Sequence, residues 1–269
     1  MNPTDGGATG GGAPPSHRLD REWYRTFFDG LALDFWEAAV PPEHTLLEVD
    51  FLERALRIAP GSRVLDVACG LGRHAVPLAK RGARLTGVDQ SLPALDRAAA
   101  AARAAGVAVE WVHADLRALP WEAAFDAGYC FGNSLGYIEA QETRAGLAAI
   151  GRALRPGARL ALDTGMAAES ILPRLQEREV NETAGFTFIE ENRYHPREGC
   201  IETTYTIQRG TDTMTRTGLQ YVFTLREIAD AVEAAGFSVD SIEGGIDGSP
   251  FAIGSPLLVL CATRRGGAR

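Results

Sequence analysis

The sequence predicts an α/β fold with a seven-stranded, mostly parallel sheet that carries helices on both faces. Short apolar runs of strand length alternate with helical stretches between residues 63 and 163. A glycine-rich turn joins the first apolar run to the next helix, and two further apolar runs close the chain. Such alternation is typical of a parallel sheet covered on both faces. We also expect an N-terminal helical lid and a small antiparallel β insertion.

The N-terminal part divides into two segments. Residues 1–17 are dominated by glycine and proline and lack the basic and apolar regions of a signal peptide, so we expect a disordered tail. Residues 18–60 are predicted to form the helical lid segment. Within it, Arg18–Val40 is amphipathic and aromatic, and Thr45–Ala59 has apolar residues at helical spacing.

The main domain is expected at residues 61–177 and 224–269. Its parallel strands are predicted at Arg63–Val67, Ala83–Val88, Ala108–His113, Phe125–Phe131 and Arg159–Asp163, with helices starting near Gly72, Pro93 and Gln141. After a last helix at Thr224–Ala235, stopped by Gly236, the runs Ser238–Glu243 and Pro256–Thr263 predict an antiparallel pair at the sheet edge.

Between the two parts of the main domain, the alternation of strand-like and helix-like stretches ends. A helix-like run at Ala167–Glu177 precedes three stretches that alternate with period two, around a turn at Pro196–Gly199. This pattern predicts antiparallel hairpins. We assign residues 178–223 to a β-rich insertion that covers the substrate or makes an oligomer contact.

The most informative motif is VLDVACGLGRHA, from Val64 to Ala75. It reads as a buried strand, a tight turn and a helix start. Gly70 and Gly72 let the backbone approach a ligand, because glycine has no Cβ and tolerates positive φ, and the helix start adds a partly positive end. Asp89 ends the next apolar run, where a carboxylate can accept both hydroxyls of a ribose. Together these residues predict an adenosine-containing ligand.

Two cofactor classes use this geometry. Gly70–Ala75 also satisfies the dinucleotide fingerprint G-x-G-x-x-G/A. The surroundings favour the other class. Asp66 lies inside the first strand, where it would repel a pyrophosphate but suits the ammonium of a methionine moiety. Asp115 follows the third apolar run, within reach of an adenine amino group. We therefore favour S-adenosyl-L-methionine (SAM) over a nicotinamide cofactor.

This pattern of a GxG turn and three acidic residues resembles the class I SAM-dependent methyltransferases, which have a Rossmann-like fold. VLDVACG together with Gly132-Asn133-Ser134 is similar to the glycine N-methyltransferase-like branch that acts on small molecules. The resemblance implies SAM as cofactor and S-adenosyl-L-homocysteine as product. The expected cofactor-binding residues are Tyr24, Asp66, Ala68, Gly70, Gly72, Asp89, Gln90, Asp115, Leu116 and Phe131.

One departure from that branch concerns the substrate. The family places an arginine just after the fifth-strand aspartate to clamp the glycine carboxylate. Here the run is LALDTGMAAES, and no arginine appears until Arg174. Because a bidentate carboxylate clamp needs a guanidinium group, we do not expect glycine to be the substrate.

Four residues are candidates for the catalytic, acceptor side of the site. The amide of Asn133 can donate to and accept from a polar substrate, or stabilise a turn. Tyr137 and Tyr221 can orient a hydroxyl or an amine, or pack in the core. His195 can act as a general base, but its place before Pro196 at a hairpin turn also fits a surface histidine.

Composition limits the partners. The formal net charge is −8 and long basic clusters are lacking, which argues against nucleic-acid binding. The four cysteines have no CxxC spacing, so we expect no metal site and reduced thiols in a cytoplasmic protein. No apolar run is long enough to span a membrane. We expect methyl transfer to N or O of a small polar or natural-product-like molecule, with a homodimer left open. The alternatives are a protein or nucleic-acid methyltransferase, or a SAM-binding regulatory module without turnover.

Overall fold

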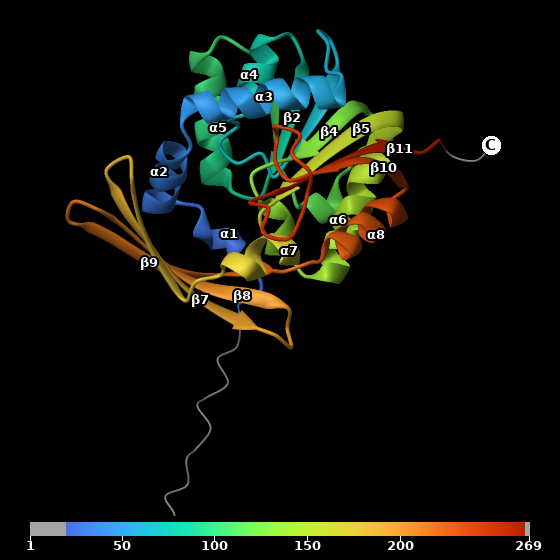
Figure 1. Cartoon of the computed structure of the whole chain (residues 1–269). Helices are drawn as coiled ribbons and strands as arrows, with labels where there is room; N and C mark the ends of the chain where they lie inside the picture. Colours follow the sequence, from blue (N-terminus) through green and yellow to red (C-terminus); the bar gives the residue numbers. More distant parts are fainter. Residues whose placement is uncertain (1–19, 267–269) are drawn as a thin grey trace, which may run out of the picture.

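A seven-stranded sheet forms the centre of the computed structural model, which describes residues 20–266 (Figure 1). Its order is β10-β11-β5-β4-β1-β2-β3, and β11 alone runs antiparallel to the other six strands, so it forms antiparallel pairs with both β5 and β10. The strands are β1 (Arg63–Val67), β2 (Arg84–Asp89), β3 (Val109–His113), β4 (Phe125–Cys130), β5 (Leu154–Thr164), β10 (Phe237–Glu243) and β11 (Leu258–Arg264). This confirms the predicted fold class, including the antiparallel pair at one edge. The strand order reverses at β1, between β2 and β4, and parallel sheets bind ligands at such a point.

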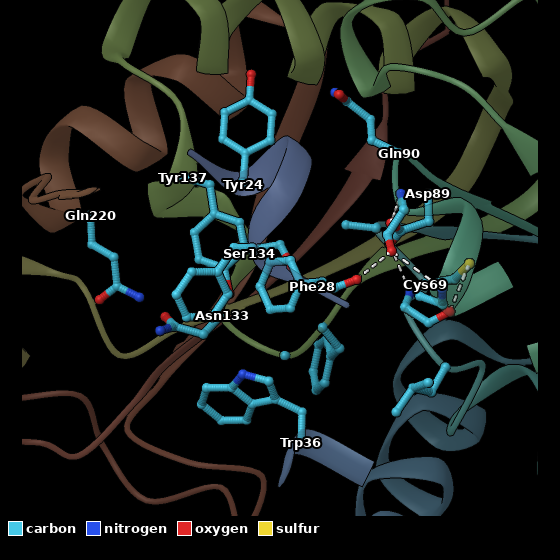
Figure 2. Close-up of a pocket in the computed structure, with 18 of the residues that line it drawn as sticks. Tyr24, Phe28, Trp36, Cys69, Asp89, Gln90, Asn133, Ser134, Tyr137 and Gln220 are labelled. Carbon is cyan, nitrogen blue, oxygen red and sulfur yellow. Dashed lines mark hydrogen bonds between the residues drawn. The ribbon is translucent and has the colours of Figure 1, made fainter. Parts of the chain in front are cut away.

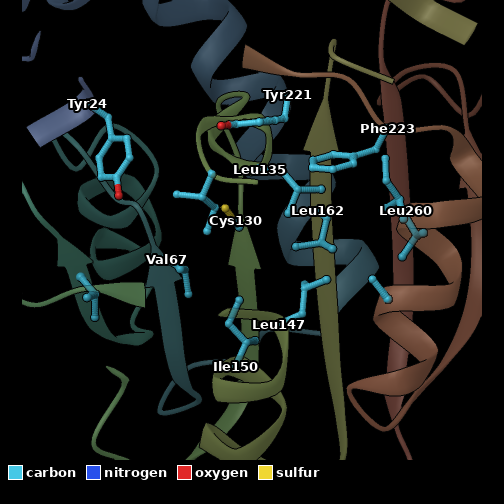
Figure 3. Packing of buried hydrophobic residues seen from close by; sticks show 14 of the residues in the cluster. Tyr24, Val67, Cys130, Leu135, Leu147, Ile150, Leu162, Tyr221, Phe223 and Leu260 are labelled. Carbon is cyan, nitrogen blue, oxygen red and sulfur yellow. The ribbon is translucent and has the colours of Figure 1, made fainter. Parts of the chain in front are cut away.

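Helices cover both faces of this sheet because its central strands are buried on both sides. One face carries α3 (Pro42–Leu56) and α4 (Ala75–Lys80), with α5 (Leu92–Ala104) beside α4; the other carries α6 (Ala140–Ala153) and α8 (Leu225–Ala234). On the second face, Leu147 and Ile150 of α6 pack against Val67 and Leu162 of the sheet (Figure 3). The sheet is therefore packed against helices below its carboxyl edge.

The predicted insertion forms a separate antiparallel sheet of four strands. They are β6 (Arg178–Thr183), β7 (Phe186–His195), β8 (Cys200–Arg209) and β9 (Asp212–Tyr221), paired in chain order. The sequence predicted only three of them. It missed β6 because that strand is largely exposed and lacks an alternating apolar face. The helix predicted at Ala167–Glu177 is also shorter: α7 (Ala168–Ile171) and a 3-10 turn, η3 (Leu172–Arg174), replace it.

The N-terminal segment lies between the two sheets (Figure 1). It contains α1 (Tyr24–Phe27) and α2 (Gly30–Ala39), which contact β8 and β9 of the insertion. Two short 3-10 turns, η1 (Leu116–Ala118) and η2 (Ser134–Tyr137), follow β3 and β4. The disordered tail predicted at residues 1–17 lies outside the described residues. Within residues 20–266, no helix has the length and apolar character needed to cross a membrane.

Candidate cofactor and acceptor site

A cavity of about 510 Å³ opens at the carboxyl ends of the five parallel strands. Ligand pockets commonly have this size. Its walls come from the loops after β1 to β5, from the N-terminal segment and from the insertion. Figure 2 shows Cys69, Asp89 and Gln90 at one end of this cavity, and Trp36, Asn133, Tyr137 and Gln220 at the other. Three parts of the chain that are far apart in sequence therefore enclose one space.

The glycine turn after β1 forms part of the first end. Gly70 has a φ of +51°, and no atom lies within 4 Å of the position a Cβ would take. A ligand can therefore approach its backbone closely. Ala68 also lines the cavity with a positive φ of 56°. Gly72 does not line it: a Cβ there would come within 2.5 Å of the Trp111 ring. The predicted ligand contact of Gly72 is replaced by tight packing between the turn and β3.

Asp89 is fixed by the same turn. Its Oδ2 accepts a hydrogen bond from the Gly70 N–H at 2.8 Å, and its Oδ1 accepts one from the Ser91 N–H at 2.8 Å. Burial raises the pKa of this carboxyl above its usual value. Each carboxylate oxygen has a further lone pair, and the residue lines the cavity. This arrangement fits the two adjacent hydroxyls of a ribose.

The loop after β3 supplies the far side of this end. Asp115 and Leu116 line the cavity there, with Gln90 and Tyr24. Burial acts to raise the pKa of Asp115, but its hydrogen bonds with the Arg117 guanidinium and backbone outweigh burial and lower it. Asp115 is therefore an oriented carboxylate. Phe131 also lines the cavity, from the end of β4.

A buried ion cluster, which the sequence did not predict, lies behind the glycine turn. Glu48 of α3 is 5% exposed and bonds both the Arg73 guanidinium and His74 Nε2, the latter at 3.0 Å. Burial opposes ionisation of Glu48, but the bonds with His74 and Arg73 lower its pKa to about 2. Arg73 also lines the cavity. Its charge is thus balanced by Glu48.

Asp66 lies outside the cavity wall. It is 1% exposed, its Oδ2 has no hydrogen-bond partner among the described residues, and burial raises its pKa to about 8. Its side chain extends from the middle of β1 toward Tyr129 of β4, whose hydroxyl partly opposes that rise. The predicted direct contact between Asp66 and a cofactor ammonium is therefore not made from the cavity wall, which leaves the predicted route through the Gly70 backbone.

Asn133 stabilises its turn, which is one of its two predicted roles, and it also lines the cavity. Its backbone is left-handed, with φ 68°, and its Oδ1 accepts hydrogen bonds from the Gly165 N–H at 2.9 Å and the Thr164 hydroxyl at 3.0 Å. The buried Asp163 accepts the N–H groups of Gly132 and Asn133, at 2.7 and 3.1 Å. The Asn133 amide nitrogen has no partner among the described residues, and the side chain lines the cavity.

Of the other three acceptor candidates, one lines the cavity and two lie outside it. Tyr137 lines the cavity, at an angle to Trp23 with ring centres 5.0 Å apart. Tyr221 lies outside it, in the apolar cluster with Leu135 and Phe223 (Figure 3). Its neighbour Gln220 faces the cavity instead, because successive side chains of a strand point to opposite faces. His195 also lies outside the wall, at the end of β7, where its Nε2 is 2.9 Å from Glu202.

Sequence reasoning missed three polar residues of the insertion that line the cavity: Glu190, Tyr205 and Gln220. Glu190 shares a face of β7 with the buried rings of Phe186 and Phe188. An acidic residue in an otherwise apolar inward face is the signal that could have identified it. The strand periodicity alone did not show which face points to the cavity.

Comparisons with known proteins agree with this geometry. Residues 64–157 match the family model of a methyltransferase domain. The chain is 29% identical over 208 residues to the cypemycin N-terminal methyltransferase of a Streptomyces species, spanning 76% of this chain and 84% of that protein. The structure of the CcbJ methyltransferase of Streptomyces caelestis superposes with a TM-score of 0.78 at 18% identity, covering 92% of this chain and 100% of the other.

The chain has the fold of a class I SAM-dependent methyltransferase. A second solved structure shares it: a SAM-bound amino pentose methyltransferase from Micromonospora echinaspora, with a TM-score of 0.65 at 21% identity and coverage of 88% of this chain and 97% of the other. The matched residues 64–157 contain all but the first residue of β1 and all of β2 to β4, so they include the glycine turn, Asp89 and Asn133.

Proposed function

We propose that the chain is an enzyme that transfers the methyl group of SAM to a nitrogen or oxygen of a small polar or natural-product-like molecule. The observation that supports this proposal is one shared cavity, because an end whose residues fit an adenosine and a polar, aromatic end both open into it. The first end fits SAM: the backbone at Gly70 is open to a ligand, and Asp89 presents a fixed carboxylate.

SAM supplies an activated methyl group on a sulfonium leaving group. The chain's own residues then have to position the acceptor and exclude water. In this proposal Asp89 holds the ribose, Asp115 and Leu116 face the adenine, and Asn133 and Tyr137 contact the acceptor. Trp23, Phe27 and Phe28 line the cavity from the N-terminal segment and add aromatic surface to its acceptor end.

The walls of the cavity also limit the size of the acceptor. The insertion and the N-terminal segment both contribute to the cavity wall, so a small molecule fits better than a folded protein or a duplex. The related cypemycin enzyme is an N-terminal methyltransferase by name, and the structural neighbour from Micromonospora acts on an amino pentose. Both names support a small or terminal acceptor group. The glycine N-methyltransferase-like branch remains a prediction from the sequence.

Two measurements test the proposal. Calorimetry is expected to show binding of SAM and S-adenosyl-L-homocysteine and no tight binding of NADH. Methyl transfer from labelled SAM to a panel of small amines, hydroxyl compounds and amino sugars is expected to find at least one substrate. Tight NADH binding without SAM binding would overturn the cofactor assignment. SAM binding with no turnover on that panel, a peptide panel or nucleic acid would favour a regulatory SAM-binding module.

A further inference from the structure

The acceptor end of the cavity contains a carboxylate with no cation beside it. Glu190 of β7 lines the cavity, and no described residue forms an ion pair or a hydrogen bond with its side-chain carboxylate. Carboxylates that are largely removed from water are normally paired. Burial accordingly raises the pKa of Glu190 to about 7, and the charge of Glu179 adds to that rise.

The neighbouring carboxylate of Glu179 makes ionisation of Glu190 less favourable still. It lies directly opposite Glu190 in the antiparallel pair of β6 and β7, so the two side chains are on the same face. Like charges directly opposite each other destabilise a sheet. Neither glutamate has an ion-pair partner among residues 20–266. A cation bound at this point would remove the repulsion and complete the pairing.

The nearby arginines do not supply that cation. Arg216, on the same face of the insertion, bonds Asp29 at 2.5 Å and two backbone carbonyls of the N-terminal segment. Arg73 is balanced by Glu48. Arg174 lines the cavity but donates to the carbonyls of Ser170 and Pro256, both at 3.1 Å.

Aromatic rings continue from Glu190 into the cavity. Tyr205 is the cross-strand neighbour of Glu190, and its ring centre is 5.2 Å from that of Phe27. Phe27 contacts Phe28 at 5.1 Å, and Phe28 stacks on Tyr137 at 5.9 Å. All four rings line the cavity. The Tyr137 and Tyr205 hydroxyls lie deep in the molecule, and burial raises the pKa of both, so both stay protonated. Ring faces attract cations, and ammonium groups are bound by such aromatic surfaces in many proteins.

We propose that this end of the cavity selects a methyl acceptor that carries a protonated amine, and that Glu190 is the residue that determines this specificity. The ammonium would bond the Glu190 carboxylate and lie against the rings of Tyr205 and Phe27. This inference rests on the proposed function, which it narrows from polar molecules in general to amines. It concerns recognition, and Glu190 makes or breaks no covalent bond in it.

The test compares amines with matched alcohols. Calorimetry on the full chain saturated with S-adenosyl-L-homocysteine measures binding of phenethylamine against 2-phenylethanol, cyclohexylamine against cyclohexanol, and glucosamine against glucose. At least one amine is expected to bind more than about tenfold more tightly than its alcohol, the size of effect that a charge-assisted hydrogen bond produces. In Glu190→Gln that preference is expected to fall to within about threefold.

The adjacent residue provides a matched control. Glu191 is exposed on the opposite face of β7, so Glu191→Gln makes the same chemical change away from the cavity and is expected to keep the preference. Glu190→Gln is expected to melt no lower than the wild type, because it removes a repulsion. The proposal is overturned if no amine is preferred, if the preference survives in Glu190→Gln, or if that variant melts well below the wild type. Absence of S-adenosyl-L-homocysteine binding would instead count against the proposed function, and the same pairs titrated into the free protein would still test the amine preference.

Discussion

Asp66 is a buried carboxylate and Asp89 is a partly buried one on the neighbouring strand, and their surroundings give them different properties. Both oxygens of Asp89 accept backbone N–H groups, whereas Oδ2 of Asp66 has no partner among the described residues. Burial raises the pKa of both, and that of Asp66 reaches about 8. At neutral pH the free protein therefore holds Asp66 largely protonated. Asp89 is the better site for a strong hydrogen bond to a ligand.

Replacing Asp89 by alanine is expected to weaken SAM and S-adenosyl-L-homocysteine binding about ten- to a hundredfold. Hydrogen bonds to a charged group contribute about 1.5–3 kcal/mol each. Asp96→Ala is the control, because Asp96 is exposed on α5. Calorimetry measures both variants. Unchanged affinity in Asp89→Ala would remove this carboxylate from the cofactor site.

Asp66→Asn is expected to gain stability relative to the wild type as pH rises from about 4 to 8. A carboxyl whose folded pKa lies above its unfolded value stabilises the fold fully below the unfolded pKa, and this contribution is lost as pH rises through the folded pKa. The asparagine variant has no carboxyl at this position, so it does not lose this stability; in the wild type the loss is at most about 1.4 kcal/mol per pH unit. Thermal unfolding of cofactor-free protein at pH 5 and pH 8 measures it. If the difference in melting temperature between Asp66→Asn and the wild type is the same at both pH values, the raised pKa of Asp66 is contradicted.

The same variant tests the predicted role of Asp66 toward the cofactor ammonium. Asparagine keeps the shape of the side chain but cannot ionise when the cofactor binds, so the sequence-based prediction is weaker SAM binding without unfolding. An unchanged dissociation constant would take Asp66 out of the site and leave it as a buried structural group of β1.

Glycine and sarcosine are expected to be poor substrates. Gly165 and its neighbours occupy the place where the glycine N-methyltransferase-like branch has a carboxylate-clamping arginine. Arg174 reaches the cavity wall, but its Nε and Nη2 already donate to the carbonyls of Ser170 and Pro256. The Nε–Nη2 edge of its guanidinium is thus engaged, which leaves only the Nη1–Nη2 edge for a bidentate pair. Efficient methylation of glycine at millimolar concentration would contradict this.

At the scale of elements, a helix or strand could be predicted from the sequence where residues within a short stretch determine it. The glycine turn, the five parallel strands and α8 were predicted because their signals are short: buried apolar runs, a GxG turn, and a glycine stop at Gly236. The structure adds a Thr224–Glu227 capping box at the start of α8. β6 was missed because an exposed strand has no apolar period. Tyr221 was predicted to face the acceptor, but Gln220 lines the cavity in its place, because the side of β9 that faces the cavity depends on how the insertion docks.

That docking predicts a sensitive position on β9. Trp23 packs onto Gly218, where a Cβ would come within 3.0 Å of the indole ring and 3.1 Å of Tyr205. Gly218→Ala is expected to cost about 1–3 kcal/mol by overpacking and to displace α1 from β9. Denaturant unfolding measures the first effect, and faster hydrogen exchange at residues 22–29 reports the second. Thr217→Ala, on the other face of β9, serves as the control. Equal exchange in both variants would show that α1 does not depend on this contact.

At the scale of the whole molecule, the N-terminal segment joins the other two parts. Asp34 of α2 bonds Arg97 of α5 at 2.6 Å and Arg209 of β8 at 2.7 Å. The carbonyl of Phe28 accepts the Ser91 hydroxyl beside Asp89, while that of Phe27 accepts Arg216 of β9. The segment is therefore bonded to the main sheet domain on one side and to the insertion on the other. Its aromatic residues line the cavity between them.

This position leads to a prediction about closure. If the N-terminal segment is a lid, a ligand bound beneath it should slow its opening, so hydrogen exchange at residues 20–40 is expected to slow when SAM binds. Deleting residues 1–16 should leave turnover intact, whereas deleting residues 1–40 removes Trp23, Phe27, Phe28 and Trp36 from the cavity wall and should abolish it. Because the longer deletion also exposes core surface, the exchange measurement on the full chain is decisive. Equal exchange with and without SAM, together with turnover by the longer deletion, would mean that the segment only packs against the fold. Slower exchange confined to residues 20–40 and the loops beside Asp89 would instead show that binding and closure are one event.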